Sequence, residues 1–326
     1  MDALDRRLVA ALQVNPRASW GEIGRAVGEH ERTVARRLQR LMADGVVRVT
    51  AIYDDLRTGV GRPAHLHVQV RPGTAARVAR ALSERSDIRS VYALTGVTDV
   101  GCELVSPARE ELHDLLSAQI SAIDGVVQTQ TRVVLHTFRT VAEWHAPLLT
   151  DEAVAALRPP PPSAPLPDVD GLSPLEEEIA KLLAADGRIP IAAVAERTGL
   201  SLPTARRRVH SLLERRLLLL RAEAEPALLG LAVEAQLWLK VRPNGLDRVG
   251  QTLAAHPNVR YCAATTGTHC LIVQVAVAHE AALYRFLSGV VGLLDEVTDI
   301  DVTLITKAYK RGHLLKSGLL TVETRT

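Results

Sequence analysis

Residues 30–45 read HERTVARRLQRLMADG, and residues 201–216 read SLPTARRRVHSLLERR. In both stretches apolar residues recur at i, i+4, i+7 and i+8, the spacing of one helical face. These positions are Val34, Leu38, Leu41 and Met42 in the first stretch and Ala205, Val209, Leu212 and Leu213 in the second. Arginine and short hydroxyl residues occupy the opposite face. The pattern predicts two amphipathic helices, each apolar on one side and basic on the other.

The two stretches belong to a longer repeat. An offset of 171 positions aligns the two halves of the chain without a gap over roughly 120 residues. The matched positions include Leu4 and Leu175, Arg17 and Arg188, Gly28 and Gly199, Thr95 and Thr266, and Asp124 and Asp295. We therefore predict two copies of one unit of roughly 150 residues, called copy one and copy two below.

Each copy divides into a helical head and an αβ domain. In copy one, helices are expected near residues 4–12, 19–27 and 30–43, followed by a wing strand at 46–52. Ser19, with Glu22 three residues later, predicts an N-cap for the second helix. The αβ domain is expected to hold strands at 64–70, 88–94, 100–105 and 126–138 and helices at 74–84 and 110–123; in copy two the same series falls at 235–241, 246–255, 259–264, 271–277, 280–291 and 297–307. The order βαββαβ is the ferredoxin-like pattern, so the fold class is α+β: a winged helix-turn-helix plus a ferredoxin-like domain, duplicated in one chain.

The domain boundaries follow from these elements. We expect helical heads at 1–55 and 172–225, αβ domains at 60–145 and 230–310, a linker at 146–171 and a C-terminal tail at 311–326. Within the linker, six of the ten residues from Arg158 to Pro167 are proline. Such a run predicts a semi-rigid polyproline spacer.

Composition excludes several classes of protein. The chain has 326 residues, 47% of them hydrophobic and 23% charged, which is typical of a globular protein. No stretch approaches the roughly 20 apolar residues of a membrane span, and the N-terminus does not resemble a signal peptide. Cys102, Cys262 and Cys270 are odd in number and lack CxxC spacing, so we expect no disulfide framework, no metal site and a reducing cytoplasm.

The basic helix faces predict contact with double-stranded DNA. Residues 30–43 carry a net charge of +3 and residues 201–216 a net charge of +4, although the whole chain is only +2. Arginine can bind guanine O6 and N7, and Ser or Thr can contact bases or phosphates. The candidate DNA-binding residues are Arg32, Thr33, Arg36, Arg37, Arg40, Ser201, Thr204, Arg207, Arg208 and Ser211. The alternative is that these side chains form an ordinary solvated helix face.

These motifs resemble the leucine-responsive / asparagine-synthase regulator (Lrp/AsnC) family of bacterial transcription factors, fused in tandem. The resemblance is carried by Leu4-Asp5-x-x-Leu8, Arg17-Ala18-Ser19-x-x-Glu22-Ile23, Thr33 to Leu41 and Asp44-Gly45-Val46-Val47, and in copy two by Leu175-Glu176, Arg188-Ile189-Pro190, Gly199-Leu200-Ser201, Thr204 to Leu213 and Leu217-Leu218. It implies a DNA-binding regulator, associated with the nucleoid in the cytoplasm, whose αβ domains dimerise and sense amino acids or related metabolites. No cofactor is expected. Because family members pair their sensor domains, we expect the two sensors of this chain to pack on each other as a pseudo-twofold dimer, with further association of chains through outer sensor surfaces.

The two heads differ at the turn before the basic helix. Copy two has Gly199-Leu200-Ser201, which resembles the family sequence and supplies Ser201 as N-cap. Copy one has Gly28-Glu29-His30, with an acidic residue in the turn and a poor cap. We expect the two heads to have different DNA preferences.

The family commonly carries a Gly-Asp-aromatic-Asp turn near its effector site. Copy one reads Thr95-Gly96-Val97-Thr98-Asp99 and copy two reads Thr266-Gly267-Thr268-His269-Cys270. The candidate effector-binding residues are therefore Gly96, Thr98, Asp99, Gly267, Thr268 and His269. The first Asp is missing from both copies, which favours an effector other than a plain amino acid, or none. The alternative is that both segments are hairpin turns selected for geometry.

An enzyme is the second hypothesis. The predicted fold is similar to that of the siroheme decarboxylases of tetrapyrrole (heme) biosynthesis. Those enzymes carry a His-x-Tyr-x-Arg cluster on the second sensor strand. Here the two equivalent strands read Ser90-Val91-Tyr92-Ala93-Leu94 and Arg260-Tyr261-Cys262-Ala263-Ala264. Because the His/Arg pair that would hold propionates and supply protons is missing, we expect a regulator with no catalytic residues.

Overall fold

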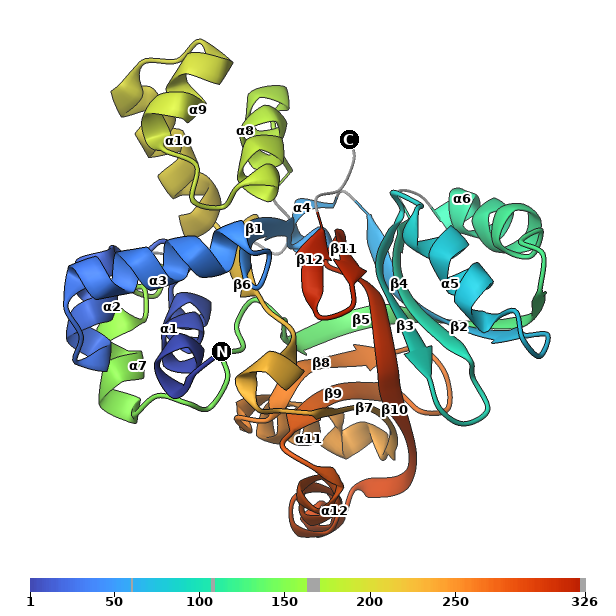
Figure 1. Cartoon of the computed structure of the whole chain (residues 1–326). Helices are drawn as coiled ribbons and strands as arrows, with labels where there is room; N and C mark the ends of the chain where they lie inside the picture. The colour runs from blue at the N-terminus through green and yellow to red at the C-terminus, as the bar shows by residue number, and fades with distance from the viewer. Residues whose placement is uncertain (60, 107–108, 163–170, 323–326) are drawn as a thin grey trace. The chain divides into compact units, whose positions relative to one another are not determined.

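A computed structural model describes residues 1–59, 61–106, 109–162 and 171–322 (Figure 1). The chain forms two compact units, and each unit combines matching parts of both copies. Unit 1 comprises Met1–Gly61 and His145–Ala224 and contains both helical heads. Unit 2 comprises Arg62–Trp144 and Glu225–Thr326 and contains both αβ domains. No described helix has the length and apolar character needed to cross a membrane.

Each head is a three-helix unit with the expected helices. Copy one has α1 (Ala3–Val14), α2 (Trp20–Val27) and α3 (Glu31–Ala43); copy two has α8 (Pro174–Ala185), α9 (Ile191–Thr198) and α10 (Leu202–Glu214). Ser19 and Glu22 form a capping box at the start of α2. Ser201 caps α10 through its side chain, whereas the side chain of His30 makes no capping hydrogen bond to α3. The difference expected between the two turns is therefore present.

The apolar faces of α3 and α10 form the centres of the heads. Val34, Leu38 and Leu41 are buried, as are their counterparts, which are Ala205, Val209 and Leu212. Met42 and Leu213 are partly buried. The basic faces of both helices are thereby left on the outer side of each head.

The wing strands do not form a hairpin within each head. Instead β1 (Arg48–Tyr53) of copy one pairs antiparallel with β6 (Leu218–Glu223) of copy two. The pairing runs from Arg48 opposite Glu223 to Tyr53 opposite Leu218. One strand alone has no ladder partner in its own head, and pairing across the copies satisfies both backbones. The two heads therefore share one two-stranded sheet.

Part of the predicted linker is helical. Residues 151–157 form α7 (Asp151–Leu157), which begins at the capping residue Thr150 and packs on α2. The Asn15 side chain donates a hydrogen bond to the Leu157 carbonyl at 3.1 Å. The predicted linker at 146–171 was therefore wrong for this segment, because the apolar side chains of α7 are buried against the first head. Residues 163–167 of the proline-rich run lie outside the described residues.

Unit 2 contains two βαββαβ domains, as the sequence predicts. Copy one has β2 (Arg62–Val70), α5 (Ala75–Ser83), β3 (Ile88–Leu94), β4 (Val100–Ser106), α6 (Arg109–Asp114) and β5 (Val126–Arg139); copy two has β7 (Val233–Val241), α11 (Leu246–Ala255), β8 (Val259–Thr265), β9 (Leu271–Val277), α12 (Glu280–Gly289) and β10 (Val297–Arg311). Short helical turns are α4 (Asp55–Thr58) in unit 1 and η2 (Pro226–Leu229), η3 (Pro243–Gly245) and η4 (Val291–Leu293) in unit 2. The helix expected at 110–123 is α6 continued by a π-helical turn, η1 (Leu115–Ile120).

The two αβ domains share one sheet. Its order is β12-β11-β10-β3-β4-β2-β5-β8-β9-β7, and β10 also pairs with β7, so eight strands close on themselves. The two junctions between copies are β5 with β8 and β10 with β3, and they have the same register at the repeat offset. Val134 opposes Thr265 in one junction, and Ile305 opposes Leu94 in the other. The predicted pseudo-twofold pairing of sensor domains within one chain is therefore present.

A matching pair of side-chain hydrogen bonds supports each junction. The Leu304 amide donates to the Thr95 hydroxyl at 2.9 Å, and the Val133 amide donates to the Thr266 hydroxyl at 3.0 Å. These residues correspond at the repeat offset. The Thr-Gly turns therefore have a structural role at the junctions.

The C-terminal residues extend the sheet. The segment expected as a tail includes the end of β10 and the hairpin of β11 (Leu314–Ser317) and β12 (Leu320–Val322). A tail outside the sensor domain was wrong for residues 311–322, because β11 pairs with the end of β10 and β12 pairs with β11. Residues 323–326 lie outside the described part of the chain.

Candidate nucleic-acid interface

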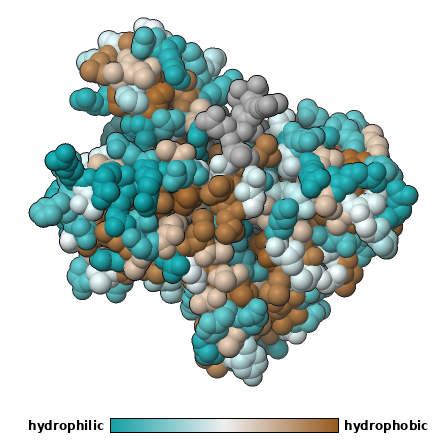
Figure 2. Space-filling model, in the orientation of Figure 1, coloured by the Kyte–Doolittle hydropathy of each residue, from teal (hydrophilic) through white to brown (hydrophobic). Residues whose placement is uncertain are grey.

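The outer side of α3 presents the first group of candidate DNA contacts. Arg32 and Arg36 are exposed, and Thr33 is partly buried. His30, Glu31, Arg32, Thr33 and Arg36 line a hollow in the surface. Figure 2 shows that hydrophilic side chains cover this side of the first head. The first turn of the helix therefore offers both cationic and anionic groups to a ligand.

Two of the candidate arginines in α3 are bound to α1. Arg37 Nη1 lies 2.6 Å from Asp2 Oδ2 and 2.8 Å from Asp5 Oδ1. Arg40 Nη2 lies 3.0 Å from the other oxygen of Asp5. Asp2 also accepts the backbone amide of Asp5, and these hydrogen bonds, with the one from Arg37, lower the pKa of Asp2. A helical wheel of α3 alone does not show these partners, because they lie some 35 positions away in sequence.

The equivalent positions in α10 are more open. Arg207 and Arg208 are exposed, and neither forms an ion pair with a residue in the described part of the chain. Ser201 Oγ lies 2.9 Å from Thr204 Oγ1 and also caps the Thr204 amide. Ser211 is partly buried. Arg206, which the helical wheel did not select, is exposed as well.

The acid of α8 that corresponds to Asp5 has another partner. Glu176 Oε1 accepts from Arg215 Nη1 at 2.7 Å. Arg215 follows the end of α10, whereas Arg37 lies in the middle of α3. The buried acid of the first helix therefore binds Arg37 within α3 in copy one, but binds a residue beyond the end of α10 in copy two.

Two reciprocal arginines join the heads. Arg17 donates to the carbonyls of Gly187 at 2.9 Å and Ile189 at 3.1 Å. Arg188 donates to the carbonyls of Pro16 at 2.7 Å and Ala18 at 3.0 Å. Partial burial lowers the pKa of both guanidinium groups. All six residues are related by the repeat offset, so this arginine clasp follows the same pseudo-twofold symmetry as the β1–β6 pair.

The candidate effector turn of copy one is integrated into the sheet. Asp99 Oδ2 accepts the Val70 amide at 2.8 Å, and the Asp99 backbone bonds to Val68 and Leu94. Gly96 is exposed with a φ of +90°, which favours glycine, and Thr98 is partly buried. The Asp99 contact explains why an acid suits this position without a ligand.

The turn of copy two has different chemistry. Gly267 and Thr268 are exposed, and His269 Nε2 lies 3.2 Å from Asp299 Oδ2. Arg132 of copy one lies against Gly267: a Cβ built on this glycine would be 3.4 Å from Arg132 Nε. Sequence reasoning missed Arg132 because only the closed sheet brings it to the other copy. The two turns thus differ in charge.

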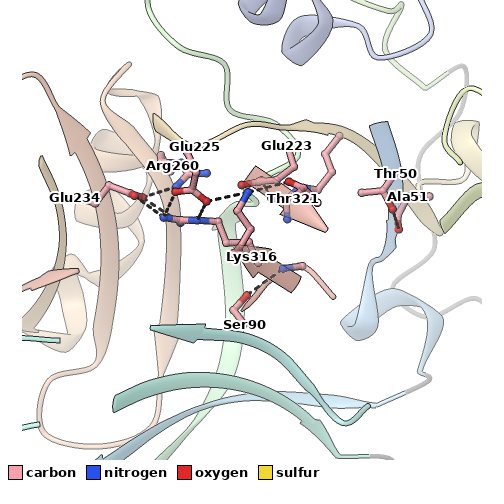
Figure 3. Close-up of polar contacts among 12 residues, drawn as sticks. Thr50, Ala51, Ser90, Glu223, Glu225, Glu234, Arg260, Lys316 and Thr321 are labelled. Carbon is pink, nitrogen blue, oxygen red and sulfur yellow. Dashed lines mark hydrogen bonds and ion pairs between the residues drawn. The ribbon is translucent and has the colours of Figure 1, made fainter. Parts of the chain in front are cut away.

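Arg260, on one of the two strands that the enzyme hypothesis relies on, belongs to a buried ion network. Arg260 donates to Glu234 at 2.6 Å, and Arg311 bonds to both Glu234 and Glu225 (Figure 3). Lys316 Nζ lies 2.9 Å from Glu225. Burial opposes the charge on Arg311, but the two glutamates raise its pKa above the usual value. The Arg260 side chain therefore already binds the Glu234 carboxylate of its own chain.

Two buried histidines face the other copy inside the closed sheet. His65 Nε2 lies 3.3 Å from the Tyr261 hydroxyl, and the His67 and Trp238 rings lie 4.9 Å apart. Burial lowers the pKa of His65 to about 4 and that of His67 to about 3. Both side chains are therefore neutral near pH 7.

The thiols are unreactive where they are buried. Burial raises the pKa of Cys262 to about 12 and that of Cys102 further, and Cys270 is partly exposed. The cysteines of the described segments form no disulfide, and no group of three or more metal-ligating side chains gathers there.

Comparison with known families matches both halves of the chain. An AsnC-type helix-turn-helix domain matches residues 1–42 and 175–213, and an Lrp/AsnC ligand binding domain matches residues 64–142 and 234–315. The chain is similar to the HTH-type transcriptional regulator FL11 of Pyrococcus abyssi, with 33% identity over 144 residues, which cover 44% of this chain and 95% of that protein. It is also similar to the HTH-type transcriptional regulator Ptr1 of Methanocaldococcus jannaschii, with 29% identity over 140 residues, which cover 43% and 95%. Both relatives are archaeal, and each matches less than half of this chain.

Among solved structures, the siroheme decarboxylase NirDL matches the whole chain. The TM-score is 0.61 with 16% identity, and the match covers 95% of this chain and 93% of that one. At this identity the likeness is one of fold alone.

Proposed function

This chain belongs to the Lrp/AsnC family, and from that premise we propose that it is a transcriptional regulator whose two heads bind specific sequences of double-stranded DNA. The observation that carries the proposal is the position of Arg36 and Arg207. They correspond at the repeat offset, lie opposite the buried faces of α3 and α10, and are exposed. A recognition helix presents such side chains to base edges in the major groove.

One chain would supply both heads of a DNA-binding dimer. The β1–β6 pair and the arginine clasp join the heads within unit 1. Further association of chains through outer sensor surfaces would place additional pairs of heads on neighbouring DNA. Such a protein would act on the nucleoid in the cytoplasm.

A small-molecule effector would act through the αβ domains. The Lrp/AsnC ligand binding domain is present twice, and each Thr-Gly turn lies where the two copies join. A ligand bound to either turn would therefore affect the strand pairing between the two copies. The contacting residues would be Gly96, Thr98 and Asp99 in copy one and Gly267, Thr268 and His269 in copy two. The effector would be an amino acid or a related metabolite.

We propose that the chain is not an enzyme. The alternative, siroheme decarboxylation, has the NirDL fold in its favour. Against it, Arg260 is bound to Glu234, and the second strand of copy one carries Ser90 and Tyr92 without the His/Arg pair. A shift of the siroheme Soret band when the purified protein is added, followed by decarboxylated product, would support the enzyme instead.

Selection of bound sequences from random DNA tests the proposed function. The wild-type chain should enrich a defined operator. Arg36→Ala/Arg207→Ala should then lose about 1–3 kcal/mol of operator binding for each base contact removed. The matched control is Arg80→Ala/Arg285→Ala, which removes two exposed arginines from α5 and α12 and should bind normally. If the α3/α10 double variant bound as tightly as wild type at the same salt concentration, these helices would not read DNA.

A further inference from the structure

The two recognition helices differ at their first residue. Helix α3 begins at Glu31 and α10 begins at Leu202, and these positions correspond at the repeat offset. Both side chains are on the surface: Glu31 is exposed, and Leu202 is an exposed large hydrophobic residue with 45% of its surface accessible. In helix-turn-helix proteins the N-terminal residues of this helix contact base edges. The difference therefore lies at the position where sequence is read.

The two side chains suit different bases. A carboxylate only accepts hydrogen bonds, and in the major groove it pairs with the N4 amino group of cytosine. An exposed leucine has no polar group and instead gains from contact with the C5-methyl group of thymine. Glu31 lines the same hollow as Arg32 and Arg36, so it belongs to the surface that these two cations present to DNA.

The surrounding charge also differs between the helices. Arg37 is bound by Asp2 and Asp5 of α1, whereas Arg208 at the equivalent position is exposed and forms no ion pair with a described residue. Because phosphate contacts release counterions, free arginines give binding its salt dependence. Helix α10 therefore has more cationic charge available for phosphates than α3.

We propose that the chain reads an operator with two unlike half-sites. The half-site under α3 contains a cytosine that donates to Glu31, and the half-site under α10 contains a thymine whose methyl group packs on Leu202. The second head also makes the stronger phosphate contacts. This inference rests on the proposed function and specifies the DNA that the same helices bind.

The thymine contact can be tested without perturbing the fold. In the operator selected from random DNA, each thymine is replaced in turn by uracil, which lacks only the methyl group. One replacement should weaken wild-type binding about three- to fivefold, the effect of removing one buried methyl group. The same replacement should have no effect on Leu202→Ala, which already lacks the contact and alters only an exposed side chain. Equal uracil effects on both proteins, or none on wild type, would overturn the Leu202 assignment.

The cytosine contact predicts a change of base preference. Glu31→Gln should shift the preferred base at one position of the other half-site from cytosine to adenine, because a glutamine amide matches adenine N6 and N7. An unchanged selected sequence would refute the role of Glu31.

In the same operator, Arg208→Ala should reduce the slope of log affinity against log salt concentration by about 0.9, and Arg37→Ala should reduce it by less. A larger reduction with Arg37→Ala would refute the charge difference.

The selection itself separates the two levels of inference. If no sequence is enriched by the wild-type chain, the proposed function fails. If the enriched operator is a symmetric palindrome with the same bases in both halves, the chain is a DNA-binding regulator but the two heads read alike, and only this inference fails.

Discussion

The arginine clasp gives a direct way to loosen the two heads without changing their charge. Arg17→Lys/Arg188→Lys keeps both positive charges, but a lysine ammonium cannot form the planar fork that reaches two carbonyls at once. The exchange therefore breaks at least one of the two hydrogen bonds that each arginine donates to carbonyls of the opposite head. The β1–β6 pair remains, so the heads stay linked but are held less firmly.

The size of the effect follows from the hydrogen bonds that are lost. A typical intramolecular hydrogen bond contributes a net 0.5–1.5 kcal/mol, and bonds from charged donors contribute more. Arg17 and Arg188 are only partly buried, which reduces their share through solvent screening. We expect the double variant to lower the free energy of unfolding by about 2–4 kcal/mol.

Two assays measure this change. Denaturant unfolding gives the stability difference, and DNA binding is compared on fragments with one and with two half-sites. The double variant should bind a single half-site as wild type does, with the same salt dependence, and should lose affinity only for the two-half-site fragment. Arg25→Lys/Arg197→Lys, on the exposed sides of α2 and α9, is the matched control. Unchanged stability together with an unchanged preference for two half-sites would refute a structural role for the clasp.

Three other outcomes concern unit 2. Because burial lowers the pKa of His65 to about 4 and of His67 to about 3, the unfolded chain takes up protons below about pH 6.5 that the folded chain does not. The free energy of unfolding should therefore be fully retained above pH 6.5 and fall by about 1–2 kcal/mol per pH unit toward pH 5. His65→Gln, which introduces the residue found at the equivalent position of copy two, should reduce that slope by about 1 kcal/mol per pH unit in unfolding curves measured at different pH. A free energy of unfolding that does not change with pH would contradict the buried neutral state of the histidines. Asp99→Asn keeps an acceptor for the Val70 amide but removes the charge, so it should abolish the response to any effector found by thermal-shift screening while DNA binding without effector persists; a full response would exclude Asp99 from the site. In the native chain a thiol reagent should modify Cys270 and leave Cys262 intact, as peptide mass spectrometry would show; early labelling of Cys262 would mean that it is not buried.

Elements defined by local pattern could be predicted from the sequence. The periodicity of α3, the capping box at Ser19 and the βαββαβ order depend on neighbours within one helix or one strand, and they were confirmed. The pairing of the two sensor domains was expected from the family resemblance, and the Thr-Gly turns that support both junctions correspond at the repeat offset.

Contacts between distant segments could not be predicted in this way. Periodicity shows that residues 48–53 form a strand but does not show which strand completes the ladder. Likewise, the wheel places Arg40 on the side of α3 opposite the apolar stripe, and only the packing of α1 brings Asp5 to it. The candidate arginines of α3 therefore include two that are bound to acids of α1, whereas Arg207 and Arg208 of α10 form no ion pair with a described residue.

The number of chains per operator tests the central claim most directly. Native mass spectrometry of the purified chain on a DNA fragment with both selected half-sites gives the ratio of chains to occupied half-sites. If the β1–β6 pair and the arginine clasp hold the two heads so that both bind DNA at once, the ratio is one chain to two half-sites. A ratio of one chain to each half-site, with the second head of every chain unbound, would contradict it.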